Sequence, residues 1–270
     1  MTQMQRLLEV MASLRDPQRG CPWDQQQTFQ TILPYTLEEV YEVAEAIEQG
    51  DMGALREELG DLLFQVAFYA QLAKEAGEFD FDDIATGISD KLVQRHPHVF
   101  GDAEIADAEA QSRAWEAHKA RERHARAADE GRPASVLDNV PRALPGLMRA
   151  MKLQRRAARV GFDWPDMAPV LDKVEEELAE LRQVVAEGGD ADRLEHELGD
   201  LMFACVNLCR HAGLEPEMAM RGVNHRFETR FRRVETLARD QNQRLAQMSL
   251  EELDRLWTQA KAEEAAAKKE

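Results

Sequence analysis

Acidic residues recur at a fixed spacing in two parts of the chain, and such residues could hold a metal ion. The first set comprises Glu39, Glu42, Glu58 and Asp61, and the second comprises Glu177, Glu180, Glu197 and Asp200. Each set contains two pairs spaced three residues apart, so the two carboxylates of a pair share one face of a helix. Oxygen-only ligands select hard cations such as Mg²⁺ or Mn²⁺, and Mg²⁺ commonly serves phosphate chemistry.

Glycines midway between the paired motifs predict how the acids of each set meet. Gly50 lies at the centre of the first set, and Gly188 and Gly189 lie at the centre of the second. Residues equidistant from the turn of an antiparallel helical hairpin lie level, so each set is expected to converge roughly 12 Å from its turn. Four facing carboxylates repel one another and raise one another's pKa unless a cation neutralises them. No histidine or thiolate is expected at that level, so the predicted ligand set is all-oxygen.

For any single E-x-x-E motif on a helix, the alternative to a metal site is an acidic helix face that is only solvated. Here the acids lie beside an apolar stripe, occur as two level pairs, and recur about 139 residues later. That recurrence favours two metal sites over an accidental acidic surface. The period is half the chain, which indicates a duplicated domain rather than a short solenoid repeat.

The elements that must position the acids are helices. Apolar residues follow the 3–4 spacing of amphipathic helices, and no segment alternates with the period of a strand. The sequence therefore predicts an all-α fold with two duplicated helical-bundle domains built on antiparallel helix hairpins. The expected divisions are an N-terminal helical domain at 1–101, a helical and proline-punctuated connector at 102–145, a C-terminal helical domain at 146–262 and a tail at 263–270.

The net charge and the cysteine content limit which classes of binding partner and which cellular compartment are expected. The chain has 34 Lys and Arg residues against 51 Asp and Glu residues, giving a formal net charge of −17. That charge argues against a nucleic-acid coat or an anionic membrane as the partner, because both require a positive field. No signal-peptide run or stretch of about 20 apolar residues occurs, and three cysteines cannot pair fully, so a cytoplasmic location is expected.

An anionic substrate would still need local cations. The candidates for phosphate or base contacts are Lys173, Arg193, Asn224, Arg226, Arg230 and Trp257 in the C-terminal copy, and Lys91 and Arg95 in the N-terminal copy. Basic residues on surface helices are often only solvated. Trp257 could stack on a base or merely close the core. In the N-terminal copy the positions that match Lys173 and Arg193 are Tyr35 and Ala54, so the C-terminal copy is expected to carry most of the turnover.

The sequence lacks the motifs that are typical of several other classes of enzyme. The chain lacks a P-loop, a dinucleotide-binding glycine motif and an H-E-x-x-H zinc motif. His96 and His98 flank Pro97 and have no third clustered ligand, so a structural role is favoured there.

Three groups of residues together resemble the MazG family of nucleoside triphosphate pyrophosphohydrolases. They are Gly20-Cys21-Pro22-Trp23-Asp24 with Gln27-Thr28, the doubled E-E-x-x-E and E-L-G-D motifs, and Arg95-His96-Pro97-His98-Val99-Phe100. The resemblance extends from about Leu7 to Trp257. It implies an all-α dimer that hydrolyses nucleoside triphosphates with Mg²⁺ to the monophosphate and pyrophosphate. Arg226 departs from the family pattern, in which a lysine is frequent at this position. The planar, forked guanidinium group of arginine therefore replaces the compact ammonium group of lysine as the donor.

The resemblance also implies residue roles. The family's metal ligands, which also carry the catalysis, match Glu177, Glu180, Glu197 and Asp200, and its nucleotide contacts match Lys173, Arg193, Arg226, Arg230 and Trp257. Water would attack the α-phosphorus in line, and one uncommitted carboxylate would take its proton. If the base were recognised only by stacking on Trp257, the enzyme would discriminate little among bases, as expected for nucleotide-pool housecleaning.

Two other functions remain open at this point. The chain could be a Mg²⁺-dependent hydrolase of another diphosphate or polyphosphate compound, or a non-catalytic helical protein that binds nucleotides or other partners. A two-helix hairpin cannot enclose both its own apolar stripe and a ligand site, so a homodimer or larger homo-oligomer is expected.

Overall fold

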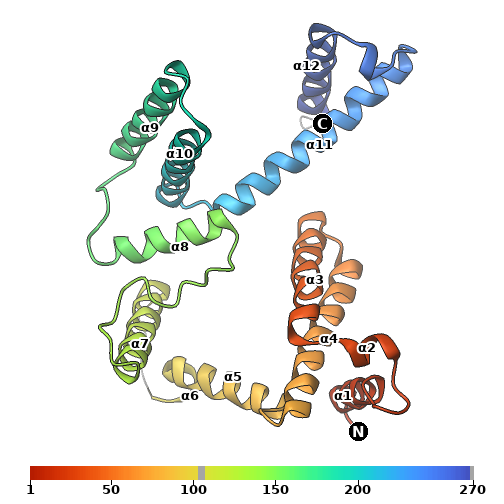
Figure 1. Ribbon diagram of the computed structural model, residues 1–270, viewed down its shortest axis with the longest axis vertical. Coiled ribbons are helices and arrows are strands. Elements are labelled where there is room, and N and C mark those ends of the chain that lie inside the picture. Colours follow the sequence, from red (N-terminus) through yellow and green to blue (C-terminus); the bar gives the residue numbers. More distant parts are fainter. Residues whose placement is uncertain (103–106, 268–270) are drawn as a thin grey trace. The chain divides into compact units, whose positions relative to one another are not determined.

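The computed structural model describes residues 1–102 and 107–267 (Figure 1). Within these ranges every regular element is a helix and no strand occurs. The prediction of an all-α fold is therefore confirmed. The chain divides into two compact units, Met1–His118 and Lys119–Glu270.

The first unit is built around a long helical hairpin. Helix α3 (Phe29–Gln49) packs along α4 (Met52–Ala76), and α1 (Gln3–Leu14) packs on α4. A core of Met11, Ile32, Phe68 and Leu72 joins these three helices. The unit also contains α2 (Pro22–Gln26), α5 (Phe81–Arg95), α6 (Pro97–Phe100) and the first half of α7 (Ala108–Asp129).

The predicted glycine turn closes the first hairpin. Gly50 adopts a left-handed conformation with φ of 69°, which a residue without a Cβ reaches at little cost. The next residue, Asp51, caps α4 by accepting hydrogen bonds from the backbone N–H groups of Gly53 and Ala54. The short connection forces α3 and α4 to run antiparallel.

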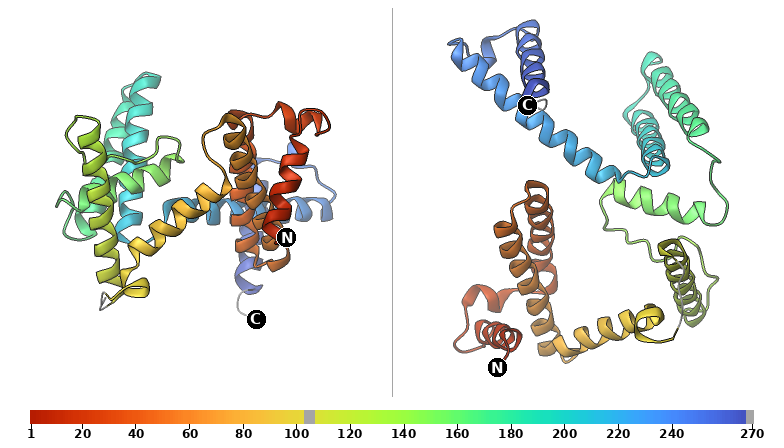
Figure 2. Two further views of the ribbon diagram at one scale, coloured as in Figure 1. Left: turned by 90° about the horizontal axis from the view of Figure 1, so that it is seen from below. Right: turned by 180° about the vertical axis from the view of Figure 1, so that it is seen from behind.

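The second unit contains a matching hairpin. Helix α9 (Ala168–Ala186) packs along α10 (Ala191–His211), and α8 (Gly146–Ala158) packs on α10. Gly188 in the turn has φ of 67°, and Asp190 caps α10 by accepting from the N–H of Arg193. The right-hand view of Figure 2, seen from behind, again shows this α9–α10 pair side by side.

A further pair of helices follows in the second unit. Helix α11 (Pro216–Asp240) packs against α12 (Leu250–Ala267), with a short 3₁₀ turn, η1 (Leu245–Gln247), between them. Their interface is a core of Val234, Leu237, Ala238, Leu256 and Ala260. Residues 263–267, which belong to the predicted tail, continue α12, and residues 103–106 and 268–270 lie outside the described residues. The predicted domain boundaries stay predictions.

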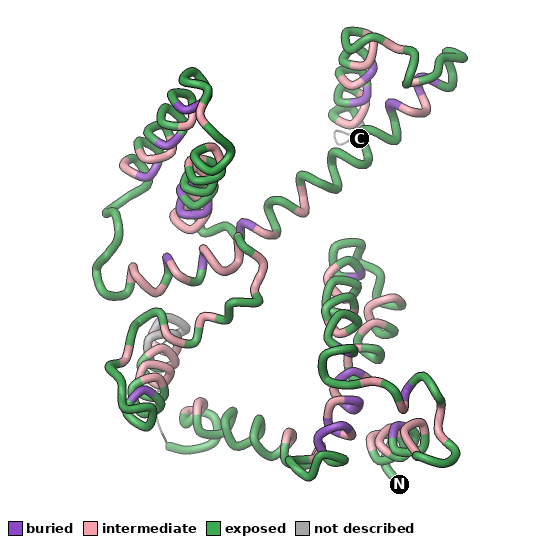
Figure 3. Tube along the Cα trace, in the orientation of Figure 1, coloured by how far each residue is buried: buried purple, intermediate pink, exposed green. Residues whose placement is uncertain are grey.

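Much of each hairpin is exposed in the single chain (Figure 3), and the exposed residues include large apolar ones. Ile47 on α3 is 60% exposed, and Val185 on α9 is 63% exposed. Other exposed apolar residues of the hairpins are Leu33, Leu37, Val40, Leu59, Leu178, Leu198 and Met202. Among the described helices, none combines the length and the apolar character that crossing a membrane requires.

Candidate functional site

The first acidic set gathers where α3 and α4 face each other. Ligand oxygens of Glu39, Glu58 and Asp61 lie within 4.8 Å of one another. Burial raises the pKa of Glu39, and the charges of Asp61, Glu42 and Glu58 raise it further. Burial and the neighbouring charges of Glu42 and Asp61 likewise raise the pKa of Glu58. The charges of the other acids of the set therefore act on both Glu39 and Glu58, as expected of carboxylates that lie close together.

The second acidic set gathers in the same way between α9 and α10. Ligand oxygens of Glu177, Glu180 and Glu197 lie within 4.8 Å of one another, and Asp200 lies on α10 with Glu197 in an adjoining cluster. Glu177 is 6% exposed. Partial desolvation, followed by the charges of Glu177 and Glu197, raises the pKa of the exposed Glu180. The hairpin geometry thus produces two similar concentrations of negative charge, one in each unit.

Lys173 partly neutralises the second set. Its Nζ atom lies 2.8 Å from Oε1 of Glu176 and 2.7 Å from Oε1 of Glu177. Hydrogen bonds to these two carboxylates raise the pKa of Lys173 above its usual range, so the side chain stays charged. This cation lies one helical turn before the acids and at their edge.

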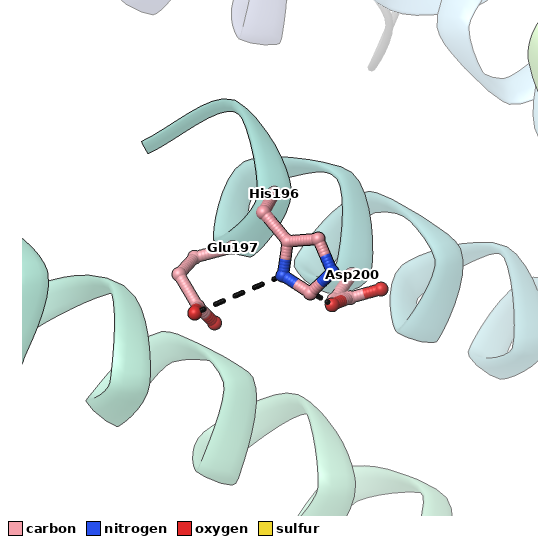
Figure 4. Close-up of side chains that lie close together, drawn as sticks. All are labelled: His196, Glu197 and Asp200. Carbon is pink, nitrogen blue, oxygen red and sulfur yellow. Dashed lines mark ion pairs between the residues drawn. The ribbon is translucent and has the colours of Figure 1, made fainter. Parts of the chain in front are cut away.

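A histidine also lies at the second set, and the expectation that none would was wrong. Figure 4 shows His196 beside Glu197 and Asp200 on α10. Its Nδ1 atom lies 3.4 Å from Oδ2 of Asp200 and 3.9 Å from Oε1 of Glu197. The sequence carried the signal, because His196 precedes Asp200 by four residues and therefore shares its helix face. The side chain is 74% exposed, so it borders the set from the solvent side.

Two arginines that were predicted to contact the nucleotide form ion pairs away from the second acidic set. Arg193 donates to Oε2 of Glu187 at 3.1 Å, in the turn of its own hairpin. Arg230 donates to Oε2 of Glu264 at 2.6 Å. In the part of the chain that the structure describes, neither arginine contacts the carboxylates of the second set. Both cations are engaged in structural ion pairs between or within helical hairpins.

The remaining candidates lie on α5, α11 and α12. Trp257 closes the core between α11 and α12, with its ring centroid 5.3 Å from that of Phe227. The Arg95 guanidinium lies over the ring of Trp115, 5.6 Å from its centroid. The structure places the other three on exposed helix surfaces: Asn224 and Arg226 on α11, and Lys91 on α5.

A cavity of about 430 Å³ opens beside the second acidic set. Lys173, Glu177 and Asp200 are among the residues that line it. The sequence patterns did not identify other residues that line the cavity, among them Gln154 and Trp164. One signal was available, because Gly161-Phe-Asp-Trp164 repeats the G-x-x-W pattern of Gly20-Cys-Pro-Trp23.

Comparison with known proteins places these two hairpins in one family. The model of the MazG nucleotide pyrophosphohydrolase domain matches residues 27–100 and 168–234. These two matches contain α3 with α4 and α9 with α10, and hence all eight acids.

Similar proteins match along nearly the whole chain. A nucleoside triphosphate pyrophosphohydrolase of Escherichia coli K12 is 50% identical over 268 residues, which cover 98% of this chain and 99% of that protein. A nucleoside triphosphate pyrophosphohydrolase/pyrophosphatase MazG of Thermotoga maritima is 39% identical over 257 residues, covering 95% of each chain. A solved structure of a MazG-related protein from Thermotoga maritima aligns with 31% identity and a TM-score of 0.37, covering 43% of this chain and 98% of that one. The chain therefore belongs to the MazG nucleotide pyrophosphohydrolase family and is an enzyme, which confirms the resemblance seen in its motifs.

Proposed function

We propose that the protein hydrolyses nucleoside triphosphates between the α- and β-phosphates, giving a nucleoside monophosphate and pyrophosphate. The observation that carries this proposal is the convergence of Glu177, Glu180 and Glu197 within 4.8 Å, beside a charged lysine. A polyphosphate needs such a combination, because its oxygens require cations while its cleavage requires a base. The names of the E. coli and T. maritima relatives support the same reaction.

The donor set fits a hard divalent cation. Carboxylate oxygens from two facing helices are the ligands that Mg²⁺ and Mn²⁺ prefer, and the mutual repulsion of the acids favours a bound cation. Glu177, Glu180, Glu197 and Asp200 would hold the ion in the second unit, and Glu39, Glu42, Glu58 and Asp61 in the first. When bound, Mg²⁺ would neutralise phosphate charge and polarise the phosphoryl group under attack.

The residues of the chain would supply the remaining functions. Lys173 would donate to phosphate oxygens as its contacts to Glu176 and Glu177 give way. One carboxylate of the second set would accept the proton of the attacking water. Helices α9 and α10 would fix these groups through the rigid hairpin, which limits the reorganisation needed at the moment of reaction.

Product analysis tests this proposal. The purified chain is incubated with each of the common ribo- and deoxyribonucleoside triphosphates in Mg²⁺ or EDTA, and the products are separated by ion exchange. Pyrophosphate and a nucleoside monophosphate are expected in Mg²⁺, with several bases accepted and no turnover in EDTA. Release of orthophosphate and a diphosphate would show that a different bond is cleaved, and full activity in EDTA would exclude the metal.

The same proposal includes a homodimer that acts in the cytoplasm on the nucleotide pool. The exposed apolar residues of α3 and α9, such as Ile47 and Val185, support the dimer, because burial of each large apolar side chain stabilises an interface by about 1.5–3 kcal/mol. A housecleaning role would follow from broad acceptance of bases, which the same product analysis measures.

A further inference from the structure

A buried polar residue of the first unit lies beside the first acidic set, and the proposed chemistry does not use it. Gln65 on α4 is 5% exposed. It follows Asp61 by about one helical turn on the same helix face, so its amide lies next to the carboxylates. A buried amide costs free energy unless its donor and acceptor groups have hydrogen-bond partners. The partners of Gln65 therefore indicate what the residue does.

The amide of Gln65 joins the first acidic set to helix α3. Burial and the charges of acidic neighbours raise the pKa of Glu39, whereas the hydrogen bond that Gln65 donates to this carboxylate lowers it. On the other side of the amide, Oε1 accepts from Oγ1 of Thr36 at 3.3 Å. A carboxylate only accepts hydrogen bonds and a hydroxyl can donate one, so both partners require the same orientation of the amide. Gln65 thus contacts Glu39 through a bond of fixed direction.

Tyr69 on α4 extends this series of hydrogen bonds into the core. Its hydroxyl oxygen lies 2.9 Å from Oγ1 of Thr36. Thr36 has one hydroxyl proton, and when it donates to Gln65 its oxygen accepts from Tyr69. The backbone carbonyl of Ile32, also 3.3 Å from Oγ1, competes for that proton, but the buried amide oxygen has less access to water. The Tyr69 ring stacks on Phe29 with the ring centroids 6.1 Å apart, which fixes the far end of the series.

The second unit holds the matching carboxylate in a different way. Its residues at the three positions of the series are apolar: Val174 for Thr36, Ala204 for Gln65 and Leu208 for Tyr69. Glu177, which matches Glu39, is paired with Lys173 instead. A neutral amide therefore contacts this carboxylate in the first unit, and an ammonium group contacts it in the second.

A neutral donor and a cation have different effects on the binding of a metal ion. An ammonium group that pairs with a carboxylate competes with the metal for its negative charge, whereas an amide leaves that charge in place. Hydrogen bonds from surrounding residues orient metal ligands, and their removal typically lowers metal affinity about 10- to 100-fold. The amide of Gln65 has the position and the hydrogen-bond direction for such a role at Glu39.

We propose that Gln65, held by Thr36 and Tyr69, is a positioning residue that orients the Glu39 carboxylate for a divalent cation. The inference rests on the proposed function, in which the acids of the first set hold the ion. It gives the series of hydrogen bonds a role in metal binding beyond satisfying a buried amide, and this role is confined to the first unit.

Binding of Mn²⁺, followed by electron paramagnetic resonance without nucleotide, tests the inference independently of turnover. The background is the full chain with Glu180→Gln and Glu197→Gln, which disables the second set. There, Gln65→Met, which keeps the side-chain volume but removes the amide, should weaken Mn²⁺ binding about 10- to 100-fold. Thr36→Val should weaken it about 2- to 10-fold. Thr36→Ser keeps the hydroxyl and should stay within about twofold of the background.

Two controls separate positioning from general destabilisation. Leu72→Val trims the core of the first unit outside the series, so it should lower the urea midpoint but not the Mn²⁺ affinity. In a second background, with Glu42→Gln and Glu58→Gln, the second set alone is intact. Gln65→Met should leave Mn²⁺ binding unchanged there, and circular dichroism should show native helix content in every variant.

Unchanged Mn²⁺ binding to the first set in Gln65→Met would overturn the inference, and so would equal losses in Thr36→Ser and Thr36→Val. A first set that binds no Mn²⁺ in its own background would overturn it too. Product analysis of the wild type reports separately on the proposed function. Mn²⁺ binding that depends on Gln65, in a protein that releases no pyrophosphate, would refute that function while supporting the positioning role.

Discussion

The ammonium group of Lys173 lies 2.7 Å from Oε1 of the buried Glu177. This pair compensates charge at the second acidic set, since Glu177 is too buried for water to do so. Among the described residues, the first set has no equivalent pair, because the matching residue is Tyr35, whose ring packs edge-on against that of Trp23 with the centroids 5.7 Å apart. Two similar carboxylate clusters therefore differ in the cation that a triphosphate would meet.

The second unit is expected to carry most of the turnover. Glu180→Gln should abolish nearly all pyrophosphate release, whereas Glu42→Gln, its counterpart in the first unit, should keep a substantial share. Both acids lie on exposed helix surfaces, so the two variants should retain helicity and assembly. Pyrophosphate release under saturating Mg²⁺ measures the difference. Equal losses would show that the two sites work as one unit.

Lys173→Met should reduce kcat/KM for triphosphates about 10- to 150-fold, because a charge-assisted contact to phosphate contributes about 1.5–3 kcal/mol. The variant should also lower the stability of the metal-free chain, since Glu177 loses its paired cation. Steady-state kinetics and urea unfolding measure the two effects. Lys152→Met, which removes an exposed lysine from α8, is the control. Unchanged kinetics in Lys173→Met would contradict the role of this cation.

His196→Gln tests whether the metal takes oxygen ligands alone. The imidazole is within 3.4 Å of Asp200 but mostly exposed, and Mg²⁺ prefers oxygen to nitrogen. We expect Mg²⁺-dependent activity within about twofold of the wild type. A drop of more than tenfold in Mg²⁺ affinity, measured by titrating activity with the metal, would make His196 part of the site.

The ion pair of Asp163 with Arg210 should make stability depend on pH. The Arg210 hydrogen bonds hold the pKa of Asp163 below its ordinary value of 3.8, with a smaller contribution from His211. A carboxylate with a depressed pKa in the folded state stabilises that state above about pH 3.8, and the gain is lost as the pH falls through the folded-state pKa. At pH 7, Asp163→Asn should therefore reduce the free energy of unfolding by about 1–3 kcal/mol.

Urea unfolding of the wild type and of Asp163→Asn at pH 7, 4 and 3 checks this prediction. The difference between the two proteins should shrink toward the lowest pH. A difference that stays constant over this range would mean that the Asp163 carboxylate is not responsible.

A homodimer should form through the exposed apolar residues of the hairpins. One chain has a mass of 30.7 kDa, and light scattering at micromolar concentration is expected to give at least twice that mass. Introducing a charge through Ile47→Glu or Val185→Glu should shift the equilibrium toward the monomer, because each residue is at least 60% exposed in the single chain. Val160→Glu, a similarly exposed position after α8, serves as a comparison. A stable wild-type monomer would refute the prediction.

The sequence by itself determined the helices, the two hairpins and the membership of the carboxylate sets. Local periodicity decides which helix face is apolar, and a short glycine turn such as Gly50 fixes the register of the two flanking helices. The convergence of Glu39 with Glu58 and of Glu177 with Glu197 follows from these local rules. The family resemblance also lay in the motifs.

Only the tertiary structure decided which other side chains surround the acids. Arg193 and Arg230 had suitable charge and spacing, but each has a carboxylate partner elsewhere, Glu187 and Glu264. The lining of the cavity includes Asp163 and Arg210, two residues 47 positions apart that form an ion pair. Such contacts arise from packing between elements that no local period connects, so the sequence pattern could predict the carboxylates but not the pocket beside them.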